Sequence, residues 1–451
     1  MEDTICAVAT ALGTNAISII RVSGDESIPV VNKIFKGKDL ASVPTHTIWY
    51  GHIIDNDKIV DEVLVTVMKG PRSFTTEDVV EINCHGGIAT TNKVLELLLR
   101  CGIRLAEPGE FTKRAFLNGR IDLVKAEGVM DLIEAKTEKE RSLAINEVSG
   151  SVSKLIHDLR EDIVSILTNI EVNIDYPEYY DIKEITNDEI LPNLEKIKNK
   201  MKDILKKSEH GKIVKEGIKT SIVGRPNAGK SSLLNSLLEE EKAIVTDIPG
   251  TTRDIVEGTI NLDGIILDMT DTAGIRKTED KVEHIGVQRS LSMIEKSNLI
   301  LFVLNNNEEV NEEEKEILKT LQGKNYIVVI NKIDLKKKID ESIFDKEKIV
   351  HLSLLENKGL DELKEKIKEM FHLELLETSD FTYLSNARSI ALLKKSMENI
   401  DKAIDGIQNG FSIDMIEIDI KEAWNNLGEI IGETYTEELI DQLFSQFCLG
   451  K

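Results

Sequence analysis

Cysteine is scarce in this chain of 451 residues, which contains Cys6, Cys84, Cys101 and Cys448 only. These residues lie far apart and form no CxxC pair, so the pattern argues against a disulfide framework and against a zinc site. No apolar run approaches the roughly 20 residues that a membrane-spanning helix needs. The first residues also lack the positive-then-apolar order of a signal peptide. We therefore expect a soluble, cytoplasmic protein that does not contact a membrane.

Positive charge is in deficit as well. The 57 Lys and Arg residues face 80 Asp and Glu residues, which gives a formal net charge of −23. Such a charge repels a polyanion, so we expect no broad basic surface for nucleic acid, although a local basic patch stays open. Hydrophobic residues make up 41% of the chain, enough for several buried cores. At roughly 100–200 residues per domain, the length suggests about three domains.

The first two parts of the chain differ in texture. Residues 1–118 mix short β-rich runs with glycine and proline, which predicts an α+β domain. The strand candidates there are residues 16–22, 63–68 and 79–82, and residues 91–100 form a helix candidate. Residues 119–215 are poor in glycine and proline and predict an all-α domain. One apolar stripe at helical spacing consists of Ile163, Ile166, Leu167, Ile170 and Ile174.

Residues 216–373 alternate apolar runs with amphipathic stretches, as in a parallel sheet covered on both faces. The runs are residues 218–223, 265–269, 299–304, 326–330 and 349–352. The helical texture returns in residues 374–451. We therefore predict a multidomain protein in which an α/β domain is inserted into one helical domain.

A glycine-rich motif lies between a strand candidate and the helix candidate 231–238. Residues 224–231 read GRPNAGKS and fit G-x-x-x-x-G-K-[ST], in which backbone N–H groups and a helix N-terminus surround a polyphosphate. We expect Lys230 to reach the β- and γ-phosphates and the Ser231 hydroxyl to bind Mg²⁺. The nucleotide-binding residues of this loop are then Asn227, Ala228, Gly229, Lys230, Ser231 and Ser232.

Two further motifs follow apolar strands. The first motif consists of Asp271, Thr272, Ala273 and Gly274. It is placed where a carboxylate can meet the Mg²⁺ shell and a backbone N–H can sense the γ-phosphate. The second, residues 331–334, reads NKID and resembles the NKxD motif of GTPases. In that motif the Asp accepts hydrogen bonds from guanine, so the resemblance assigns GTP recognition to Asn331, Lys332 and Asp334.

The run PGTTRD, residues 249–254, resembles the switch I segment of the TrmE–Era branch of GTPases. That resemblance places Thr252 on Mg²⁺. The loop that clasps guanine should lie at Ser353, where many relatives read Ser-Ala-Lys but this chain continues with Leu354 and Leu355.

The position after Gly274 lacks the glutamine that orients the attacking water in Ras-like proteins, because Ile275 occupies it. An apolar side chain cannot position water. The nearest polar candidates are Asp280 and Glu283. Arg225 and Arg253 lie in loops that we expect to be mobile rather than in a fixed finger position.

The two ends of the chain carry a more specific resemblance. Residues 444–451, FSQFCLGK, resemble the C-terminal FC-[IL]-GK signature of the MnmE/TrmE family, the tRNA wobble-uridine modification GTPases. Further agreement is found in residues 20–24 (IRVSG), 108–112 (PGEFT) and 118–123 (NGRIDL). The resemblance covers essentially the whole chain.

The family resemblance implies a function. The enzyme is a homodimer, works with an FAD-containing partner (MnmG/GidA) in a heterotetramer, and installs an aminomethyl-type group on C5 of the wobble uridine of tRNA. A tetrahydrofolate derivative bound by the N-terminal domain donates the carbon, and its contacts map to Arg21, Glu81, Arg120 and Lys451. The switch II glutamate maps to Glu283. A K⁺ ion replaces an arginine finger, and its ligands map to Asn227, Thr246, Ile248 and Thr251.

Several alternatives stay open. Glu81 and Arg21 could be ordinary strand-surface charges. Cys448 could act as a thiolate nucleophile on uridine, but a small buried apolar role is commoner for a free cysteine. A ribosome-assembly GTPase of the Era type is the alternative function, although the acidic C-terminal portion lacks the GxxG loop of a KH domain. A regulatory switch without RNA chemistry is the third reading.

Overall fold

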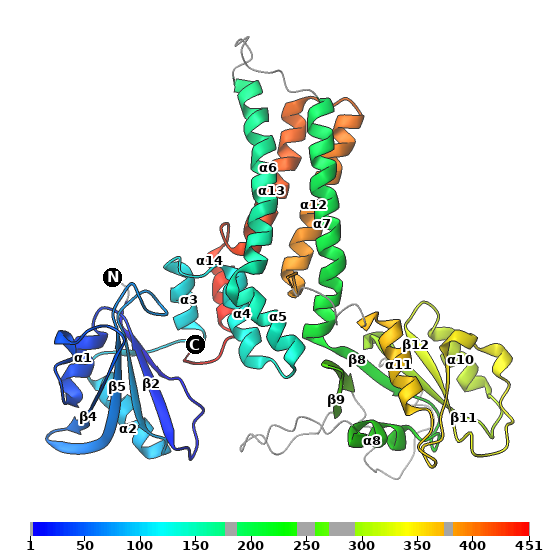
Figure 1. Cartoon of the computed structure of the whole chain (residues 1–451), viewed down its shortest axis with the longest axis horizontal. Coiled ribbons are helices and arrows are strands. Elements are labelled where there is room, and N and C mark those ends of the chain that lie inside the picture. The colour runs from blue at the N-terminus through cyan, green and yellow to red at the C-terminus, as the bar shows by residue number, and fades with distance from the viewer. Residues whose placement is uncertain (1–2, 176–186, 241–257, 270–293, 374–381, 451) are drawn as a thin grey trace. The chain divides into compact units, whose positions relative to one another are not determined.

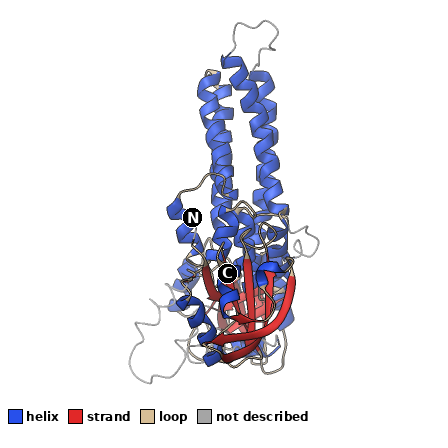
Figure 2. Cartoon of the chain, turned by 90° about the vertical axis from the view of Figure 1, so that its left-hand side faces the viewer, coloured by secondary structure: helices blue, strands red, loops and turns tan. Residues whose placement is uncertain are grey.

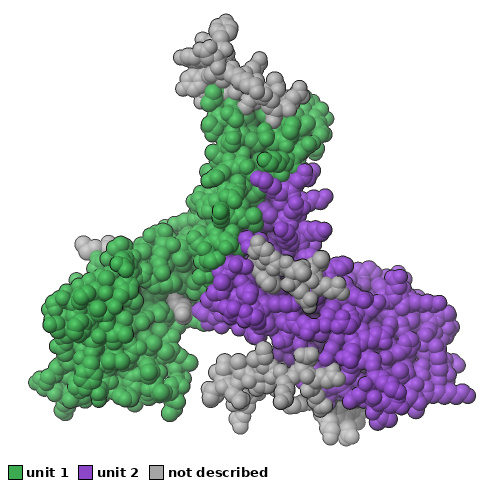
Figure 3. Space-filling model, in the orientation of Figure 1, with its two compact units in different colours: residues 1–130, 147–197, 395–451 green, residues 131–146, 198–394 purple. Residues whose placement is uncertain are grey.

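The computed structural model describes residues 3–175, 187–240, 258–269, 294–373 and 382–450. The chain divides into two compact units (Figure 3). Unit 1 consists of residues 1–130, 147–197 and 395–451, and unit 2 consists of residues 131–146 and 198–394. Each unit is therefore assembled from segments that are far apart in the sequence.

Unit 1 contains a seven-stranded sheet of strand order β3-β4-β5-β6-β2-β1-β7. Neighbouring strands are antiparallel except β1 and β7, which are parallel. The strands are β1 (Ile5–Val8), β2 (Ile17–Ser23), β3 (Phe35–Lys36), β4 (Thr47–Asp55), β5 (Lys58–Met68), β6 (Val79–His85) and β7 (Arg104–Leu105). They are red in Figure 2. The three strand candidates expected in this region are confirmed as parts of β2, β5 and β6.

One face of this sheet is covered by helices α1 (Ser27–Ile34) and α2 (Ile88–Arg100), which contact each other and the central strands. The alternation of side chains along strand β5 shows which face is the buried one. Val63, Val65 and Val67 are buried in this core, while Leu64 points to the other face. On that other face Ile48, Tyr50 and Leu64 are 63%, 59% and 48% exposed, and Tyr50 is the cross-strand neighbour of Leu64.

The remaining helices are long or C-terminal. The long α6 (Ser151–Asp175) and α13 (Ile413–Ile431) run along each other within unit 1 (Figure 1). In the predicted stripe of α6, Ile163, Ile166, Leu167 and Ile170 are buried as expected. Ile174 is 41% exposed, because it lies in the last turn before α6 ends. The other helices with residues in unit 1 are α3 (Glu110–Leu117), α4 (Leu123–Glu134), α5 (Glu138–Ser149), α7 (Asn187–Glu216), α12 (Ala387–Gln408) and α14 (Glu437–Phe444), together with the short η1 (Leu40–Ser42).

Unit 2 contains a six-stranded sheet of order β13-β12-β11-β8-β10-β9. All neighbours are parallel except the antiparallel pair β9 and β10. The strands are β8 (Ile218–Val223), β9 (Gly258–Leu262), β10 (Ile265–Met269), β11 (Leu299–Asn305), β12 (Tyr326–Asn331) and β13 (Ile349–His351). The five apolar runs of this region are confirmed as strands. The edge strand β9 was not expected.

Helices cover both faces of this sheet. Apolar side chains of α8 (Lys230–Glu240) and α11 (Leu360–Met370) join one buried core, and those of α10 (Glu312–Thr320) join the other. The short helices η3 (Glu341–Ile343) and η4 (Lys346–Lys348) connect β12 to β13. The predicted combination of α+β, helical and inserted α/β parts is confirmed. Among the described helices, none is both long enough and apolar enough to cross a membrane.

Candidate functional site

The glycine-rich loop of residues 224–229 lies between the end of β8 and the start of α8. Gly224 has a φ of +155°, and a Cβ added there would lie 2.2 Å from the carbonyl oxygen of Val303 on β11. Gly229 has a φ of +99°, and its added Cβ would lie 2.2 Å from Nδ2 of Asn331. Glycine is favoured at both positions because both have a positive φ, and at Gly224 an added Cβ would also clash with the backbone of β11.

Lys230 begins α8, and its ammonium group is directed back into the loop. Its Nζ donates hydrogen bonds to the carbonyl oxygens of Gly224, at 2.7 Å, and of Arg225, at 2.6 Å. Burial lowers the pKa of Lys230 below its usual value. The positive charge is therefore held inside the loop, where a polyphosphate would offset its desolvation.

The second motif, at the end of β12, meets this loop directly. Asn331 Nδ2 donates to the carbonyl oxygen of Ala228 at 3.0 Å, and Lys332 Nζ donates to that of Asn227 at 2.8 Å. Because β8 and β12 are both parallel to β11, which lies between them, their carboxyl ends share one edge of the sheet. The structure thus brings the two motifs together at this edge.

Asp334 is oriented by the loop that follows β13. The hydroxyl of Ser353, which is fully buried, donates to Oδ1 of Asp334 at 2.7 Å. Backbone hydrogen bonds in both directions between Ser353 and Lys358 fix this loop. The serine therefore positions the carboxylate although the residues after it differ from the expected Ser-Ala-Lys.

These residues line a cavity of about 960 Å³. The volume lies in the range of small-molecule sites, about 300–1,000 Å³. Two lining residues, Leu354 and Leu355, were not predicted as contacts, and Leu355 is 87% exposed. The lining consists of Pro226, Asn227, Gly229, Lys230, Ser231, Ser232, Ser236, Asn331, Lys332, Asp334, Leu354 and Leu355.

Arg225 corrects an expectation, because its side chain is held in place rather than mobile. Its guanidinium donates to the carboxylates of Glu308 and Glu314 and to the carbonyl oxygen of Glu309. These contacts are made across the sheet edge, by residues 83 to 89 positions further along the chain. The sequence around the glycine-rich motif gives no sign of these contacts, because the partners of Arg225 lie so far along the chain.

Part of the predicted site lies outside the described residues. Ser231 and Asn227 are the described members of the expected Mg²⁺ and K⁺ ligand sets. In the described ranges no group of three or more His, Cys, Asp or Glu side chains is arranged to hold a metal ion. The predicted residues outside those ranges are Thr246, Ile248, Thr251, Thr252, Arg253, Asp271, Thr272, Ala273, Gly274, Asp280, Glu283 and Lys451.

A second group of predicted residues lies in unit 1. Arg21 on β2 pairs with Glu81 on β6, where the two residues are cross-strand neighbours and Nε donates to Oε1 at 2.9 Å. The Arg21 guanidinium also donates to the carbonyl oxygen of Gly450 at 3.2 Å and lies 5.6 Å from the ring centroid of Phe111. Both charges are mostly buried, with side chains 18% and 21% exposed, so they are not ordinary strand-surface residues.

Arg120 belongs to the same neighbourhood. Its guanidinium lies over the ring of Phe74, 4.9 Å from the centroid, and donates to the carbonyl oxygen of the same residue at 2.7 Å. Phe74 packs against the small apolar cluster that contains Phe111. Arg21 and Arg120 are therefore linked through two stacked contacts with phenylalanine rings. Together with Glu81, these arginines supply positive charge that can pair with an anionic tail and a carboxylate that can accept hydrogen bonds.

A partly buried ion cluster in the same unit was missed by sequence reasoning. The guanidinium of Arg114 on α3, with a side chain only 5% exposed, contacts carboxylates of Asp3, Glu77 and Glu110. Arg104 reaches Asp3 and Glu110 from β7. Hydrogen bonds from Arg104 hold the pKa of Asp3 at about 2, below its usual value of 3.8. No motif indicates this cluster, because its members are spread over more than 100 positions.

Cys448 lies on the surface, contrary to the expectation of a buried apolar role. It follows the end of α14, and the neighbouring Phe447 takes the buried place instead. Its carbonyl oxygen accepts a hydrogen bond from the backbone N–H of Gly109 at 3.2 Å.

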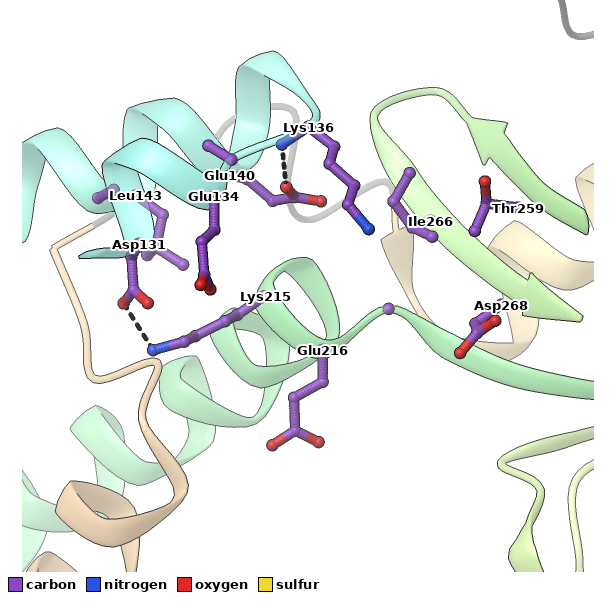
Figure 4. Close-up of a pocket in the computed structure, with 13 residues that line it drawn as sticks. Asp131, Glu134, Lys136, Glu140, Leu143, Lys215, Glu216, Thr259, Ile266 and Asp268 are labelled. Atoms are coloured by element: carbon purple, nitrogen blue, oxygen red, sulfur yellow. Dashed lines mark hydrogen bonds and ion pairs between the residues drawn. The ribbon is translucent and has the colours of Figure 1, made fainter. Parts of the chain in front are cut away.

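A further cavity of about 350 Å³ lies within unit 2 (Figure 4). It is bordered by residues of α4 and α5, the end of α7 and the β9–β10 hairpin. Lys215 pairs with Asp131 across it at 2.5 Å, and the backbone N–H of Lys136 donates to Glu140 at 2.6 Å. None of the predicted site residues lies in this cavity.

Comparison with known proteins identifies the family of the chain. A family model described as the MnmE helical domain matches residues 123–448, and one described as the GTP-binding protein TrmE N-terminus matches residues 4–120. The chain belongs to the MnmE/TrmE family of tRNA modification GTPases. The curated tRNA modification GTPase MnmE of Bacillus cytotoxicus is 53% identical to it, and the alignment covers 100% of this chain and 99% of that protein. The same figures hold for the Bacillus anthracis relative.

Solved structures resemble single parts of this MnmE-family chain. The G domain of the T. maritima FeoB iron transporter matches with 27% identity and a TM-score of 0.25, covering 34% of this chain and 98% of that one. Aquifex aeolicus Era bound to GDP and AlF₄⁻ matches with 27% identity and a TM-score of 0.24, covering 40% and 66%. At these TM-scores the likeness adds nothing to the family assignment.

Proposed function

We propose that this tRNA modification GTPase binds and hydrolyses GTP in the cavity around Lys230 and uses the reaction to modify C5 of the wobble uridine. The product is a carboxymethylaminomethyl or aminomethyl group. The observation that carries the proposal is the meeting of two motifs in one cavity, where Asn331 and Lys332 bond directly to the backbone of the phosphate loop. A phosphate loop alone suits many nucleotides, whereas its union with Asp334 selects guanine.

A role is proposed for each polar residue of this cavity. The Asp334 carboxylate, oriented by Ser353, accepts hydrogen bonds from the guanine N1–H and amino group, which adenine cannot supply together. Lys230 places its charge against the phosphates. Ser231 supplies a hydroxyl to Mg²⁺, and Asn227 supplies an amide oxygen to K⁺, both oxygen ligands suited to hard cations. Positive charge there stabilises the negative charge that develops on the phosphate oxygens during hydrolysis.

The second site is proposed to hold a tetrahydrofolate derivative that donates one carbon. Arg21, Arg120 and Glu81 supply two cationic groups and one carboxylate, beside the rings of Phe74 and Phe111. A pterin ring can donate hydrogen bonds to the carboxylate, while its glutamyl tail can pair with an arginine. Lys451, next to Gly450, completes this proposed set.

The domains and partners proposed for the chain follow its family. Residues 1–118 form the folate-binding and dimerisation domain, 119–215 and 374–451 the two helical parts, and 216–373 the GTPase domain. The protein works in the cytoplasm as a homodimer, and with an FAD-containing MnmG/GidA-type partner it forms a heterotetramer that acts on tRNA.

Mass spectrometry of tRNA nucleosides tests this proposal. Cells that lack the protein should lose the modified wobble uridine, and a plasmid carrying wild type should restore it while Lys230→Ala should not. Unchanged wobble uridines in the deletion strain would contradict the proposal. Unchanged tRNA together with defective ribosomal RNA maturation would favour the Era-type alternative.

The proposed K⁺ site has its own test. The steady-state GTPase rate should be higher in KCl than in NaCl at equal ionic strength, because the Asn227 oxygen and neighbouring carbonyls form a seat that suits the larger ion. The difference should disappear in Asn227→Ala. Equal wild-type rates in both salts would reject a K⁺ requirement, and a preference that persists in the variant would place the ion elsewhere.

A further inference from the structure

The side chain of Arg225 joins the phosphate loop to the segment that leads from β11 into α10. Its Nη1 donates to Oε2 of Glu308 at 3.2 Å. Its Nη2 donates to the carbonyl oxygen of Glu309 at 2.8 Å and to Oε2 of Glu314. The ion pair with Glu314 raises the pKa of Arg225 further above its usual value, so the charge is permanent.

Both carboxylates are themselves held in place. Glu314 has a side chain only 4% exposed, and its Oε2 accepts the backbone N–H of Asn311 at 3.0 Å as part of the capping box that starts α10. Glu308 accepts from Nδ2 of Asn305, the last residue of β11, at 2.9 Å. The guanidinium is therefore anchored to the start of a helix through Glu314 and to the end of a strand through Glu308.

The backbone of the same arginine contacts the phosphate-binding lysine. The carbonyl oxygen of Arg225 accepts from Lys230 Nζ at 2.6 Å, and that of Gly224 accepts from the same atom at 2.7 Å. A continuous chain of contacts thus runs from the buried Glu314 carboxylate through the Arg225 side chain and backbone to the ammonium group of Lys230.

We propose that Arg225 is a positioning residue for Lys230: its anchored side chain fixes the loop carbonyls that aim the ammonium group at the nucleotide phosphates. This inference rests on the proposed role of Lys230 in phosphate binding. A lysine on a loop that is free to move would lose conformational entropy when it binds phosphate. In this protein the contacts of Arg225 already order the loop in the folded state, so this cost is smaller.

Two other roles for Arg225 are less consistent with these contacts. An arginine finger needs a guanidinium directed at the transferred phosphate, but both terminal nitrogens of this one are bonded to acceptors of the 308–314 segment. A purely stabilising ion pair would need no link to the lysine, yet the Arg225 carbonyl holds Lys230 directly.

The test is a double-mutant cycle in the full-length protein, with the dissociation constant for GDP measured by competition against a fluorescent GDP analogue. Arg225→Ala should weaken GDP binding roughly tenfold, as expected when a charge-assisted contact is lost. In the Lys230→Ala background the same substitution should change the affinity by less than about twofold, because the group that it positions is gone. Glu314→Gln should reproduce part of the loss, since Gln still accepts from Asn311 but carries no charge.

The matched control is Glu312→Gln, which removes an exposed ion pair with Lys315 on the same helix and should leave GDP affinity unchanged. Thermal unfolding of each variant separates misfolding from mispositioning, and Arg225→Lys provides a variant that keeps the charge. Equal losses with and without Lys230, or no loss in Arg225→Ala and Glu314→Gln, would overturn the inference alone. Unchanged affinity in Lys230→Ala would overturn the proposed phosphate site as well.

Discussion

The role of a side chain at the cavity around Lys230 depends more on its hydrogen-bond partners than on its residue type. Asp334 would be an ordinary surface carboxylate without the hydroxyl of Ser353, which is fully buried and donates to it at 2.7 Å. That bond fixes the direction of the carboxylate before any nucleotide arrives. If Asp334 reads guanine as proposed, its selectivity depends on a buried serine that orients the carboxylate.

Replacing Asp334 with Asn should change the base preference. Guanine would then face an amide N–H where the carboxylate accepted a hydrogen bond, so GTP binding should weaken by about 10–100-fold, the cost of losing charged hydrogen bonds. Xanthosine triphosphate, which carries an oxygen at C2, should bind better than to wild type. Isothermal titration with both nucleotides measures the switch.

A suitable control is Asp340→Asn, because Asp340 caps the short helix η3 in the same domain and is not among the cavity lining residues. It should leave both affinities unchanged. An unaltered preference for GTP in Asp334→Asn would show that another group reads the base.

We expect the ion cluster of unit 1 to make the stability of the folded protein depend on pH under acidic conditions. Hydrogen bonds from Arg104 lower the pKa of Asp3 from 3.8 to about 2, so the folded state keeps this carboxylate charged where the unfolded chain binds a proton. The stabilisation is present above about pH 4 and is lost as the pH falls towards 2. Urea midpoints should therefore fall more steeply below pH 4 in wild type than in Asp3→Asn.

Tryptophan fluorescence can follow this effect, because Trp49 on β4 and Trp424 on α13 both belong to unit 1. Arg114 and Glu110 stay paired in the variant, so only part of the acid sensitivity should disappear. Parallel curves for the two proteins would mean that Asp3 titrates alike in the folded and unfolded chains.

At the scale of elements, the phosphate loop depends on close packing against the neighbouring strand. Gly224→Ala should weaken nucleotide binding and lower the thermal midpoint, because the new Cβ would lie 2.2 Å from the Val303 carbonyl oxygen at a backbone φ of +155°. Strain of this kind costs about 1–3 kcal/mol. Differential scanning calorimetry together with GDP titration measures both effects.

Gly323→Ala is the matched control in the same unit. Gly323 also has a positive φ, of +80°, but an added Cβ there meets nothing within 4 Å. The Gly323→Ala variant should show only the cost of placing a side chain at a positive φ, and its affinity for GDP should be unchanged. Similar losses of affinity in both variants would mean that contact with β11 does not shape the loop.

The sequence predicted those elements whose signals are local. Short, nearly continuous apolar runs such as residues 218–223 and 326–330 favour buried strands, and the glycine-rich loop and the NKID motif follow these two runs. The short edge strand β9 has a weaker pattern and was missed. The contacts of Arg225 with Glu314, and of Arg114 with Glu77, join residues dozens of positions apart through side chains that many polar residues could have replaced. Their pairing follows from tertiary packing, which one sequence does not display.

At the scale of the whole molecule, we expect the proposed homodimer to form through the open face of the unit 1 sheet. Ile48, Tyr50 and Leu64 expose apolar surface there, which an aqueous surface does not favour. Leu64→Glu would bring two carboxylates together across a twofold interface and should raise the dimer dissociation constant on the order of tenfold or more. Light scattering of wild type should give twice the chain mass of 50.5 kDa, with the variant shifting towards one chain.

Ile343→Glu is the control, because Ile343 is a similarly exposed apolar residue in unit 2. It should leave the dimer intact. A Leu64→Glu protein that stays dimeric at the same concentrations as wild type would place the interface elsewhere.

The interleaved units also set an order for biosynthesis. Unit 2 has all its segments once residue 394 has been translated, whereas unit 1 must wait for residues 395–451 although its sheet is made first. Arg21 bonds to the carbonyl oxygen of Gly450, 429 positions later, so the surroundings of this arginine on the second strand are completed by some of the last residues to be made. On the ribosome, unit 2 can therefore fold while unit 1, whose sheet is translated first, still lacks its last segment. A nascent chain stalled shortly after residue 394 emerges should already retain GTP but not folate.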